Sequence, residues 1–184
     1  MMSNFNATRT QLSRKYMFAL RLIDIYLAFI GISLLTPIFI IIFILTWIDT
    51  RSPFFRQERV GLHKTPFKLI KFRTMQKGTP SVVTHLASSE AITKIGSFLR
   101  RYKLDELPQL WNVLIGDMSL VGPRPGLPSH RELTRIRNEF NIYSVRPGIT
   151  GLAQVSGIDM STPKLLAKTD AEMMSTMSFY NYFR

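Results

Sequence analysis

The pattern of hydrophobic and polar positions divides the chain into one long apolar segment and several short amphipathic ones. The 24 residues between Asp24 and Asp49 include no ionisable acid or base. A neutral run of this length is typical of a membrane-embedded helix, whereas a buried core helix rarely exceeds about 20 residues. The run is too long for a signal peptide, and no small-residue cleavage site follows it. The pattern therefore predicts a membrane protein.

Two features predict that this segment enters and leaves the membrane on the same side. Pro37 at its centre removes a backbone hydrogen bond, and the Thr36 hydroxyl can bond to a freed carbonyl. Basic residues, which favour the cytoplasmic side, flank both ends. They are Arg9, Arg14, Lys15 and Arg21 before the run, and Arg51, Arg56 and Arg59 after it. We expect a re-entrant helix over about residues 16–48, broken at Thr36-Pro37; a kinked ordinary transmembrane helix is the alternative.

The pattern in the rest of the chain predicts an α+β domain over residues 51–184, mainly helical with a small β element. It follows an N-terminal segment over residues 1–50. Aromatic and β-branched residues predict strands at 53–60 and 66–75 around a turn at Gly61, then a loop at 76–88. Caps, apolar stripes and Gly or Pro boundaries predict four helices. They begin at Ser88 or Ser89, near Asp105, near Arg131 and at Thr162-Pro163.

The second of these helices is expected to end at Gly116 and to bury Leu107, Leu110, Trp111 and Leu114. The third should continue to Phe140. The last helix is amphipathic, and the aromatic tail at 177–184 suits a membrane interface. We therefore expect a monotopic protein with a re-entrant anchor and amphipathic interfacial helices.

Composition narrows the function classes. The chain has 184 residues, 46% of them hydrophobic, and a formal net charge of +12. This apolar share excludes a disordered basic tail, and the length suits one domain. The chain has no cysteine, which excludes disulfides, cysteine-ligated metals and thiol nucleophiles. The excess of positive charge indicates an anionic partner.

Asp105 and Glu106 are adjacent carboxylates at a predicted helix start. The helix dipole and free backbone N–H groups there stabilise negative charge. An ionised aspartate would be a usable nucleophile, and a neighbouring glutamate could hold a hard divalent cation. Because consecutive helical side chains diverge by about 100°, the two carboxylates should have different tasks. The alternative is ordinary helix capping.

Basic residues lie beside predicted strand ends, a helix end and rigid turns, where phosphates could be clamped. They are Lys71, Arg73, Arg100, Arg124 and Arg146. Each could instead be a solvated charge or a contact to lipid headgroups. The histidines at 63, 85 and 130 show no metal-ligand spacing, so we expect them in loops or at the surface. The sequence has no GxGxxG, Walker A or GxSxG pattern.

Four segments in fixed order carry a specific resemblance: FFRQERVG, KFRTM, LDELPQLWNVLIGDMSLVGPRP and RPGITGLAQVSG. Behind an apolar N-terminal segment, this order closely resembles the bacterial monotopic phosphoglycosyl transferases, also called bacterial sugar transferases. The resemblance covers about residues 16–184. It implies an enzyme of the bacterial inner membrane, on the cytoplasmic face, that starts the assembly of O-antigen, capsule, exopolysaccharide or glycoprotein glycan.

The resemblance also implies a reaction. A sugar 1-phosphate passes from a UDP-sugar to undecaprenyl phosphate, with release of UMP, through a covalent aspartyl intermediate in ping-pong order. Asp105 would be the nucleophile and Glu106 the Mg²⁺ ligand. Arg100 and Arg124 fall at family arginine positions expected to bind phosphate, with Lys71, Arg73 and Arg146 as weaker candidates. Membrane lipids would surround the anchor, and no nucleic acid is expected.

The chain departs from the family pattern at Gly157-Ile158-Asp159, where many relatives have Gly-Arg-Asn. We expect this region to help choose the sugar, for which we favour an N-acetylated 6-deoxy sugar over a plain hexose. Relatives often continue beyond the position of Arg184, and the large members carry a further multi-span N-terminal domain. We therefore expect a minimal catalytic form with a C-terminus that could be truncated.

Two other functions compete with the transferase. A membrane-anchored basic adaptor would hold anionic lipid electrostatically and would tolerate loss of Asp105. A Mg²⁺-dependent pyrophosphate hydrolase would use the same residues but would release sugar phosphate without a lipid acceptor.

Overall fold

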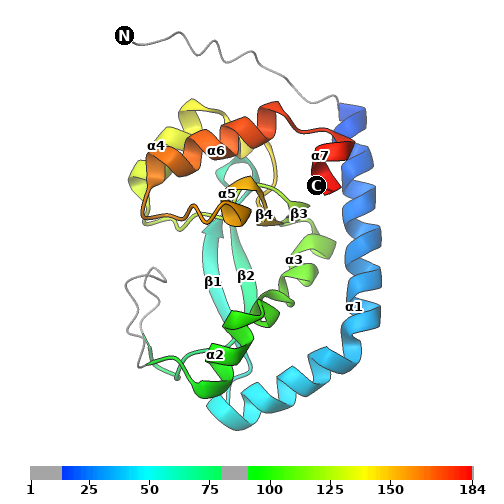
Figure 1. The fold of residues 1–184 in the computed structure, drawn as a ribbon, viewed down its shortest axis with the longest axis vertical. Helices are drawn as coiled ribbons and strands as arrows, with labels where there is room; N and C mark the ends of the chain where they lie inside the picture. The colour runs from blue at the N-terminus through cyan, green and yellow to red at the C-terminus, as the bar shows by residue number, and fades with distance from the viewer. Residues whose placement is uncertain (1–13, 80–90, 184) are drawn as a thin grey trace.

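The longest element is helix α1 (Arg14–Thr50), which forms one side and the base of the molecule in the computed structural model (Figure 1). The structure describes residues 14–79 and 91–183. By length and composition α1 could cross a membrane, and only 11% of its most apolar 18-residue window is buried. The core helix of a soluble protein would be mostly buried. Large apolar side chains such as Phe29, Leu34 and Ile48 are instead exposed along it.

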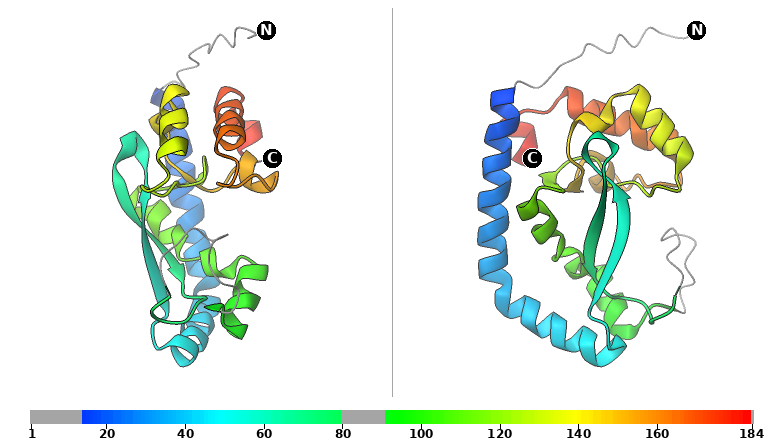
Figure 2. Two further views of the ribbon diagram at one scale, coloured as in Figure 1. Left: turned by 90° about the vertical axis from the view of Figure 1, so that its left-hand side faces the viewer. Right: turned by 180° about the vertical axis from the view of Figure 1, so that it is seen from behind.

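Helix α1 bends sharply between its two limbs, where its colour passes from blue to cyan (Figures 1 and 2). Pro37 lies inside the helix. Thr36 Oγ1 donates to the Ile32 carbonyl at 2.8 Å, and Ser33 Oγ donates to the Phe29 carbonyl at 2.9 Å. We attribute the bend to Pro37, which lacks an N–H and crowds the preceding turn. The predicted break is therefore a bend within one continuous helix.

A long antiparallel hairpin follows α1. Strands β1 (Phe54–Val60) and β2 (Pro66–Phe72) pair from Phe54 opposite Phe72 to Val60 opposite Pro66. The short helix η1 (Leu62–Lys64) joins them. Both strands were predicted, but β2 ends at Phe72, three residues before the predicted end. Met75 forms an isolated bridge with Ile92 instead.

The sequence did not predict the second sheet, in which β3 (Ser119–Val121) pairs in parallel with β4 (Gly148–Thr150). The two backbones approach closely at Gly148, where an added Cβ would lie 2.0 Å from the Gly122 nitrogen. Glycine at position 148 therefore allows this pairing.

Helix α2 (Lys94–Arg101) begins later than predicted. The Thr93 hydroxyl caps it by accepting from the Gly96 N–H at 2.9 Å. Ile92 is in the bridge to Met75 rather than in the helix. The predicted caps Ser88 and Ser89, most of the predicted loop and His85 lie outside the described residues.

The predicted helix near Asp105 is a short helix η4 (Leu104–Glu106) followed by α3 (Gln109–Ile115), which ends at Gly116 as predicted. Its predicted buried face was wrong at Trp111, which is 54% exposed. The fully buried Asn112 instead faces β2: its Oδ1 accepts from the Ile70 N–H at 3.0 Å, and its Nδ2 donates to the Lys68 carbonyl at 2.9 Å. This contact turns Trp111 outward.

The remaining elements form the upper part of the molecule in Figure 1. Helices α4 (Arg131–Glu139) and α6 (Pro163–Ser175) begin where predicted. Between them come η5 (Ile142–Ser144) and α5 (Leu152–Val155). Helices α4, α5 and α6 enclose one apolar cluster around Leu133 and Leu166. Two further clusters join α1 to the hairpin, α2 and α3.

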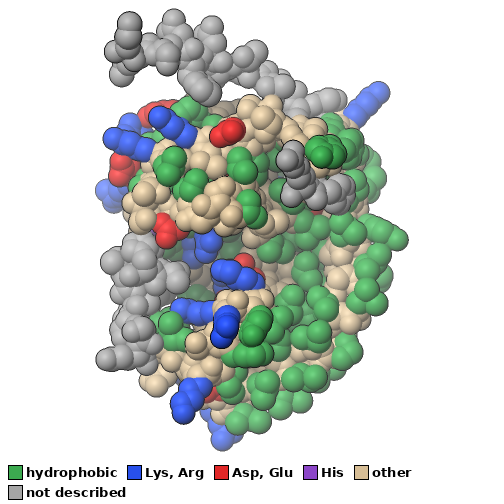
Figure 3. Space-filling view, viewed as in Figure 1, with side chains coloured by type: hydrophobic (Ala, Val, Ile, Leu, Met, Phe, Trp, Pro, Cys, Tyr) green, Lys and Arg blue, Asp and Glu red, His purple; other side chains and the backbone are tan. Residues whose placement is uncertain are grey.

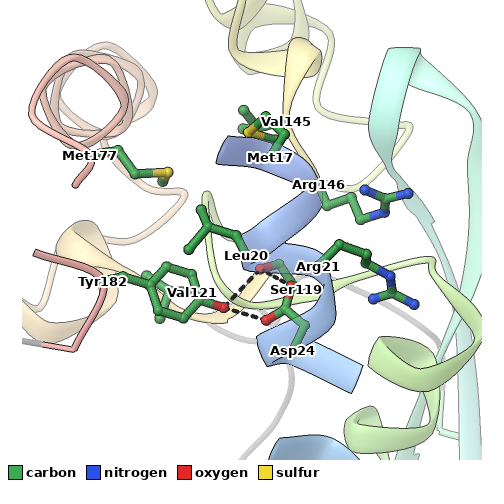
Figure 4. Close-up of a pocket in the computed structure, with 10 residues that line it drawn as sticks. All are labelled: Met17, Leu20, Arg21, Asp24, Ser119, Val121, Val145, Arg146, Met177 and Tyr182. Atoms are coloured by element: carbon green, nitrogen blue, oxygen red, sulfur yellow. Dashed lines mark hydrogen bonds between the residues drawn. The ribbon is translucent and has the colours of Figure 1, made fainter. Parts of the chain in front are cut away.

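The chain ends in α7 (Phe179–Phe183), which is attached to α1 by hydrogen bonds. Asp24 on α1 is buried and accepts from the Tyr182 hydroxyl and from Ser119 Oγ at 2.8 Å (Figure 4). It also accepts from the Leu120 N–H at 2.9 Å. The aromatic tail was predicted to lie at a membrane interface. Tyr182 is instead part of the core, whereas Tyr180 is 72% exposed.

The structure is thus mainly helical with small sheets, as predicted. The division of the chain at residues 50 and 51 stays a prediction, although α1 does end at Thr50.

Candidate active site

A polar cleft lies between the hairpin, η4 and the turn Gly122–Gly126. Its polar lining comes from four separate parts of the chain: Arg59, Lys71, Glu106, Gln109 and Arg124. Figure 3 shows Lys and Arg side chains, with acidic ones among them, gathered in the middle of the molecule. Three cations around a carboxylate suit a ligand that carries phosphate.

Lys71 and Glu106 form an ion pair in this cleft, with 2.7 Å between Nζ and Oε1. Burial alone raises the pKa of Glu106, but the charge and hydrogen bond of Lys71, with help from Arg124 and Lys103, lower it below its usual value. Glu106 is therefore ionised at neutral pH. Lys71 comes from β2, and Glu106 is held by the turn that connects α2 to α3.

Asp105 lies beside Glu106 but is more deeply buried, at 7% exposure. Burial raises the pKa of Asp105, and Glu106 raises it further, whereas Lys71, Arg100 and Lys103 act in the opposite direction. A carboxylate that is poorly solvated is a stronger nucleophile once ionised, and the three cations favour its ionised form. The two carboxylates thus have different environments; that they have different tasks stays a prediction.

Arg100 is in the last turn of α2, on the side of Asp105. Its Nε donates to Thr74 Oγ1 at 2.8 Å, which fixes the guanidinium beside β2. Its charge lowers the pKa of Asp105, so the two side chains interact electrostatically. The structure thus brings Arg100, Lys71 and Arg124 toward the carboxylate pair.

Arg124 stands between two prolines in the turn that follows β3. The carbonyl of Arg124 accepts from Arg137 Nη1 at 2.8 Å, and the next carbonyl, of Pro125, accepts from Arg59 Nη1 at 3.0 Å. Prolines restrict φ, so this backbone is held both covalently and by hydrogen bonds. The Arg124 side chain is left to line the cleft.

Arg73 and Arg146 do not line this cleft. Arg73 donates to the carbonyls of Ser52 at 3.0 Å and Phe54 at 3.2 Å, at the start of the hairpin. Arg146 donates to the Gly116 carbonyl at 2.8 Å and lies beside Arg21 in a second pocket, which Tyr182 lines from the opposite side (Figure 4). For these two arginines, the predicted contact to phosphate stays a prediction.

Sequence reasoning missed Arg59 and Gln109 as cleft residues. Arg59 was interpreted only as a flanking charge. Burial and the charge of Arg124 lower the pKa of Arg59 and Glu106 raises it, with a net value of about 10, so Arg59 remains a cation at neutral pH. Gln109 is 2% exposed and lies three residues after Glu106. The alternation along β1, and the helical spacing from Glu106, were the signals that could have identified them.

The donor set bears on the predicted magnesium ion. Among the described residues, no group of three or more His, Cys, Asp or Glu side chains could hold a metal. Mg²⁺ usually keeps several waters and is held by one or two carboxylates plus substrate phosphates. Glu106 engages Lys71 through Oε1 and has its second oxygen available for such a contact. The residues therefore fit an ion that arrives with substrate phosphate. His63 is exposed in the hairpin turn, and His130 precedes α4.

Comparison with known proteins gives consistent matches. The model of the family described as bacterial sugar transferase matches residues 15–184. The chain is 42% identical over 142 residues to a UDP-glucose:undecaprenyl-phosphate glucose-1-phosphate transferase of Klebsiella pneumoniae, covering 74% of this chain and 30% of that protein. It is 40% identical over 143 residues to a protein of the same name from Caulobacter vibrioides, covering 75% and 54%.

The match to a further relative covers a larger share of that relative's length. The chain is 38% identical over 144 residues to a putative undecaprenyl-phosphate N-acetylgalactosaminyl 1-phosphate transferase of Bacillus subtilis, covering 77% of this chain and 79% of that protein. The chain spans less than a third of the length of the first relative and about half of the length of the second. Because the family model matches nearly the whole chain, the protein belongs to the bacterial sugar transferase family.

Proposed function

We propose that this protein transfers a sugar 1-phosphate from a UDP-sugar to undecaprenyl phosphate and releases UMP. The observation that carries the proposal is the pair of carboxylates with unlike environments at a cleft lined by Lys71, Arg59 and Arg124. Relatives named as undecaprenyl-phosphate sugar-phosphate transferases support the reaction class. A diphosphate donor needs cations around it, and a displacement at phosphorus needs a nucleophile.

The first half-reaction would use Asp105. A carboxylate oxygen of Asp105 attacks the β-phosphorus of the UDP-sugar, and the bond from this phosphorus to the bridging oxygen breaks. UMP leaves with that oxygen, and the sugar phosphate stays on Asp105 as an acyl phosphate. Arg100 and Lys71, which favour the ionised form of Asp105, would keep this nucleophile charged.

In the second half-reaction, an oxygen of undecaprenyl phosphate attacks the same phosphorus. The bond between Asp105 and phosphorus breaks, the carboxylate is restored and a lipid diphosphate sugar leaves. UMP leaves before the lipid reacts, so the order is ping-pong. Arg124 and Arg59 would bind phosphate oxygens in both halves.

Glu106 would hold Mg²⁺ together with phosphate oxygens of the donor. When bound, this ion neutralises charge on the transferring phosphate. The ion pair with Lys71 orients Glu106 for this role and keeps it ionised.

Membrane attachment fits the lipid acceptor. We infer that α1 enters the cytoplasmic face of the bacterial inner membrane and returns to it, with the bend at Pro37 as its deepest part. The exposed apolar side chains of both limbs and basic residues before and after the apolar run support this topology. A shallow anchor would hold the cleft where the phosphate of a long-chain lipid is presented.

The sugar stays a prediction. The names of the relatives include glucose, galactose and N-acetylgalactosamine, whereas we expected an N-acetylated 6-deoxy sugar. A screen of UDP-sugars with detection of UMP identifies the donor.

The decisive experiment follows UMP in detergent or nanodisc samples with and without undecaprenyl phosphate. We expect one equivalent of UMP without the lipid, continuous release with it, and none from Asp105→Ala. Continuous release of UMP without a lipid phosphate would instead identify a hydrolase. Binding to anionic vesicles with no UMP release under either condition would favour the adaptor.

A further inference from the structure

Arg137 and Asp170 form a buried ion pair behind the cleft, between α4 and α6. Arg137 is 2% exposed and Asp170 is 1% exposed. The guanidinium donates to Asp170 Oδ2 from Nε at 3.0 Å and from Nη2 at 2.6 Å. The pair joins two of the helices that contribute to the apolar cluster around Leu133 and Leu166. Neither residue was a candidate site residue in the sequence.

A buried ion pair is a weak way to stabilise the packing of two helices. Removing two charges from water costs several kcal/mol per ion, and apolar side chains of similar volume often replace such pairs without loss of stability. Asp170 Oδ1 is also buried with no hydrogen-bond partner among the described residues. Stability alone therefore does not account for an arginine at position 137.

The third nitrogen of the Arg137 guanidinium indicates a second role for this side chain. Arg137 Nη1 donates to the carbonyl of Arg124, the residue whose side chain lines the cleft, at 2.8 Å. The guanidinium also lies next to Gly126, where an added Cβ would be 3.4 Å from Nη1. Asp170 binds Nε and Nη2 of the planar guanidinium, and this fixes the direction of Nη1 toward the Arg124 carbonyl.

This contact completes a series along the turn. The Pro123 carbonyl accepts from the Gly148 N–H at 2.9 Å, and the Gly126 carbonyl accepts from the Val60 N–H at 3.0 Å. Arg59 holds the Pro125 carbonyl from the hairpin side. Four successive carbonyls of the turn thus accept hydrogen bonds, and Arg137 is the donor to the carbonyl of Arg124.

We propose that Arg137 and Asp170 are positioning residues for donor binding, which fix the direction of the Arg124 side chain by holding its backbone carbonyl. The proposal rests on the transferase function proposed above. Small displacements of a positioned group cost much of its effect, so loss of this contact should weaken donor binding rather than folding.

The test replaces the pair by apolar residues of similar size, Arg137→Met with Asp170→Leu. We expect the unfolding midpoint to stay near that of the unaltered protein and the KM for the UDP-sugar to rise on the order of ten-fold, with a smaller change in kcat. The matched control is Arg135→Met with Glu139→Leu, an exposed ion pair on the same helix with 2.9 Å between its atoms. It should leave KM unchanged.

A cycle with Arg124→Ala shows whether the effect passes through Arg124. In the Arg124→Ala background, replacing the buried pair should change KM no further, because the side chain that it directs is gone. If both effects multiply, or if the apolar pair has the KM of the unaltered protein, the proposal is wrong. Arg137→Lys answers the same question if the apolar pair does not fold, since one ammonium cannot serve Asp170 and the carbonyl as a fork does.

The proposed function and this inference fail in different ways. If the unaltered protein releases no UMP, the transferase is wrong. Binding of UDP, measured by calorimetry, then gives the same comparison of variants without turnover, and equal affinities for UDP would overturn the positioning role.

Discussion

Lys71 and Glu106 are joined by a hydrogen-bonded ion pair that links the hairpin to the turn between α2 and α3, with 2.7 Å between Nζ and Oε1. About a fifth of each side chain is exposed, so the pair faces the cleft rather than bulk water. Burial raises the pKa of Glu106, and Lys71 opposes this effect more strongly than Arg124 or Lys103 does. The lysine thus helps to keep the proposed metal ligand ionised.

Replacing Lys71 by glutamine should therefore shift the pH dependence of turnover. Glu106 and Asp105 must both be ionised, and loss of Lys71 raises the pKa of each, so the acidic limb of kcat/KM should move to higher pH. At neutral pH we expect a loss on the order of 10²-fold, as for other groups that stabilise charge at a reaction centre. Lys68→Gln, on the same strand with an exposed side chain, is the control. An unchanged acidic limb in Lys71→Gln would contradict this role.

Asp105→Asn should abolish turnover and at the same time stabilise the fold. Burial raises the pKa of Asp105, so its charge opposes folding at neutral pH. Protonated Asp105 contributes its full stabilisation of the fold at pH values below the pKa of this group in the unfolded chain. That contribution is lost as the pH rises through the pKa of Asp105 in the folded protein. A neutral amide avoids this loss, and we expect Tm to rise by about 2 °C at pH 7.

The measurement is thermal unfolding of both proteins at several pH values. The difference in Tm should disappear below the pKa of an unfolded aspartate, about 3.9. Glu172→Gln, an exposed position on α6, controls for net charge. A difference in Tm that persists unchanged at low pH would show that something other than the charge of Asp105 is responsible.

Local signals predicted the elements that depend on local physics. The uncharged run predicted α1, the aromatic and β-branched residues predicted the hairpin, and Pro163 marked the first turn of α6. Asp105 and Glu106 could be singled out because two adjacent carboxylates precede an apolar stripe. A proline at the centre of an apolar run predicted either a break or a kink, and the structure has one continuous helix with Pro37 inside it.

Features that depend on distant contacts could not be predicted. Strands β3 and β4 are three residues each and pair across more than 25 positions, so neither has a pattern of its own. Trp111 was assigned to the core by its hydrophobicity, but the polar Asn112 occupies the inner face because it binds the edge of β2. Arg59 became a cleft residue only when the turn after β3 folded onto β1.

Tyr182→Phe tests the attachment of the C-terminal helix to α1. The tyrosine hydroxyl donates to the buried carboxylate of Asp24, and burial raises the pKa of Tyr182, so it stays a donor over the ordinary pH range. Its loss should lower the free energy of unfolding by about 1–2 kcal/mol. Tyr180→Phe removes an exposed hydroxyl from the same helix and should have almost no effect. Equal effects of the two substitutions on denaturant midpoints would refute the anchoring role.

Pro37→Ala tests the proposed topology of α1. Without the proline the helix can straighten, and a straight apolar run of 24 residues would be about 36 Å long, enough to cross a hydrocarbon core of about 30 Å. The chain has no cysteine, so single cysteines introduced at positions 5 and 62 can be labelled in intact cells without background.

In the otherwise unaltered protein both sites should be protected from an impermeant reagent, and in Pro37→Ala one should become accessible. Thr36→Ala removes the hydroxyl bond to Ile32 but keeps the proline, so it should retain the original labelling. Opposite accessibility of the two sites before any change at Pro37 would show that α1 crosses the membrane.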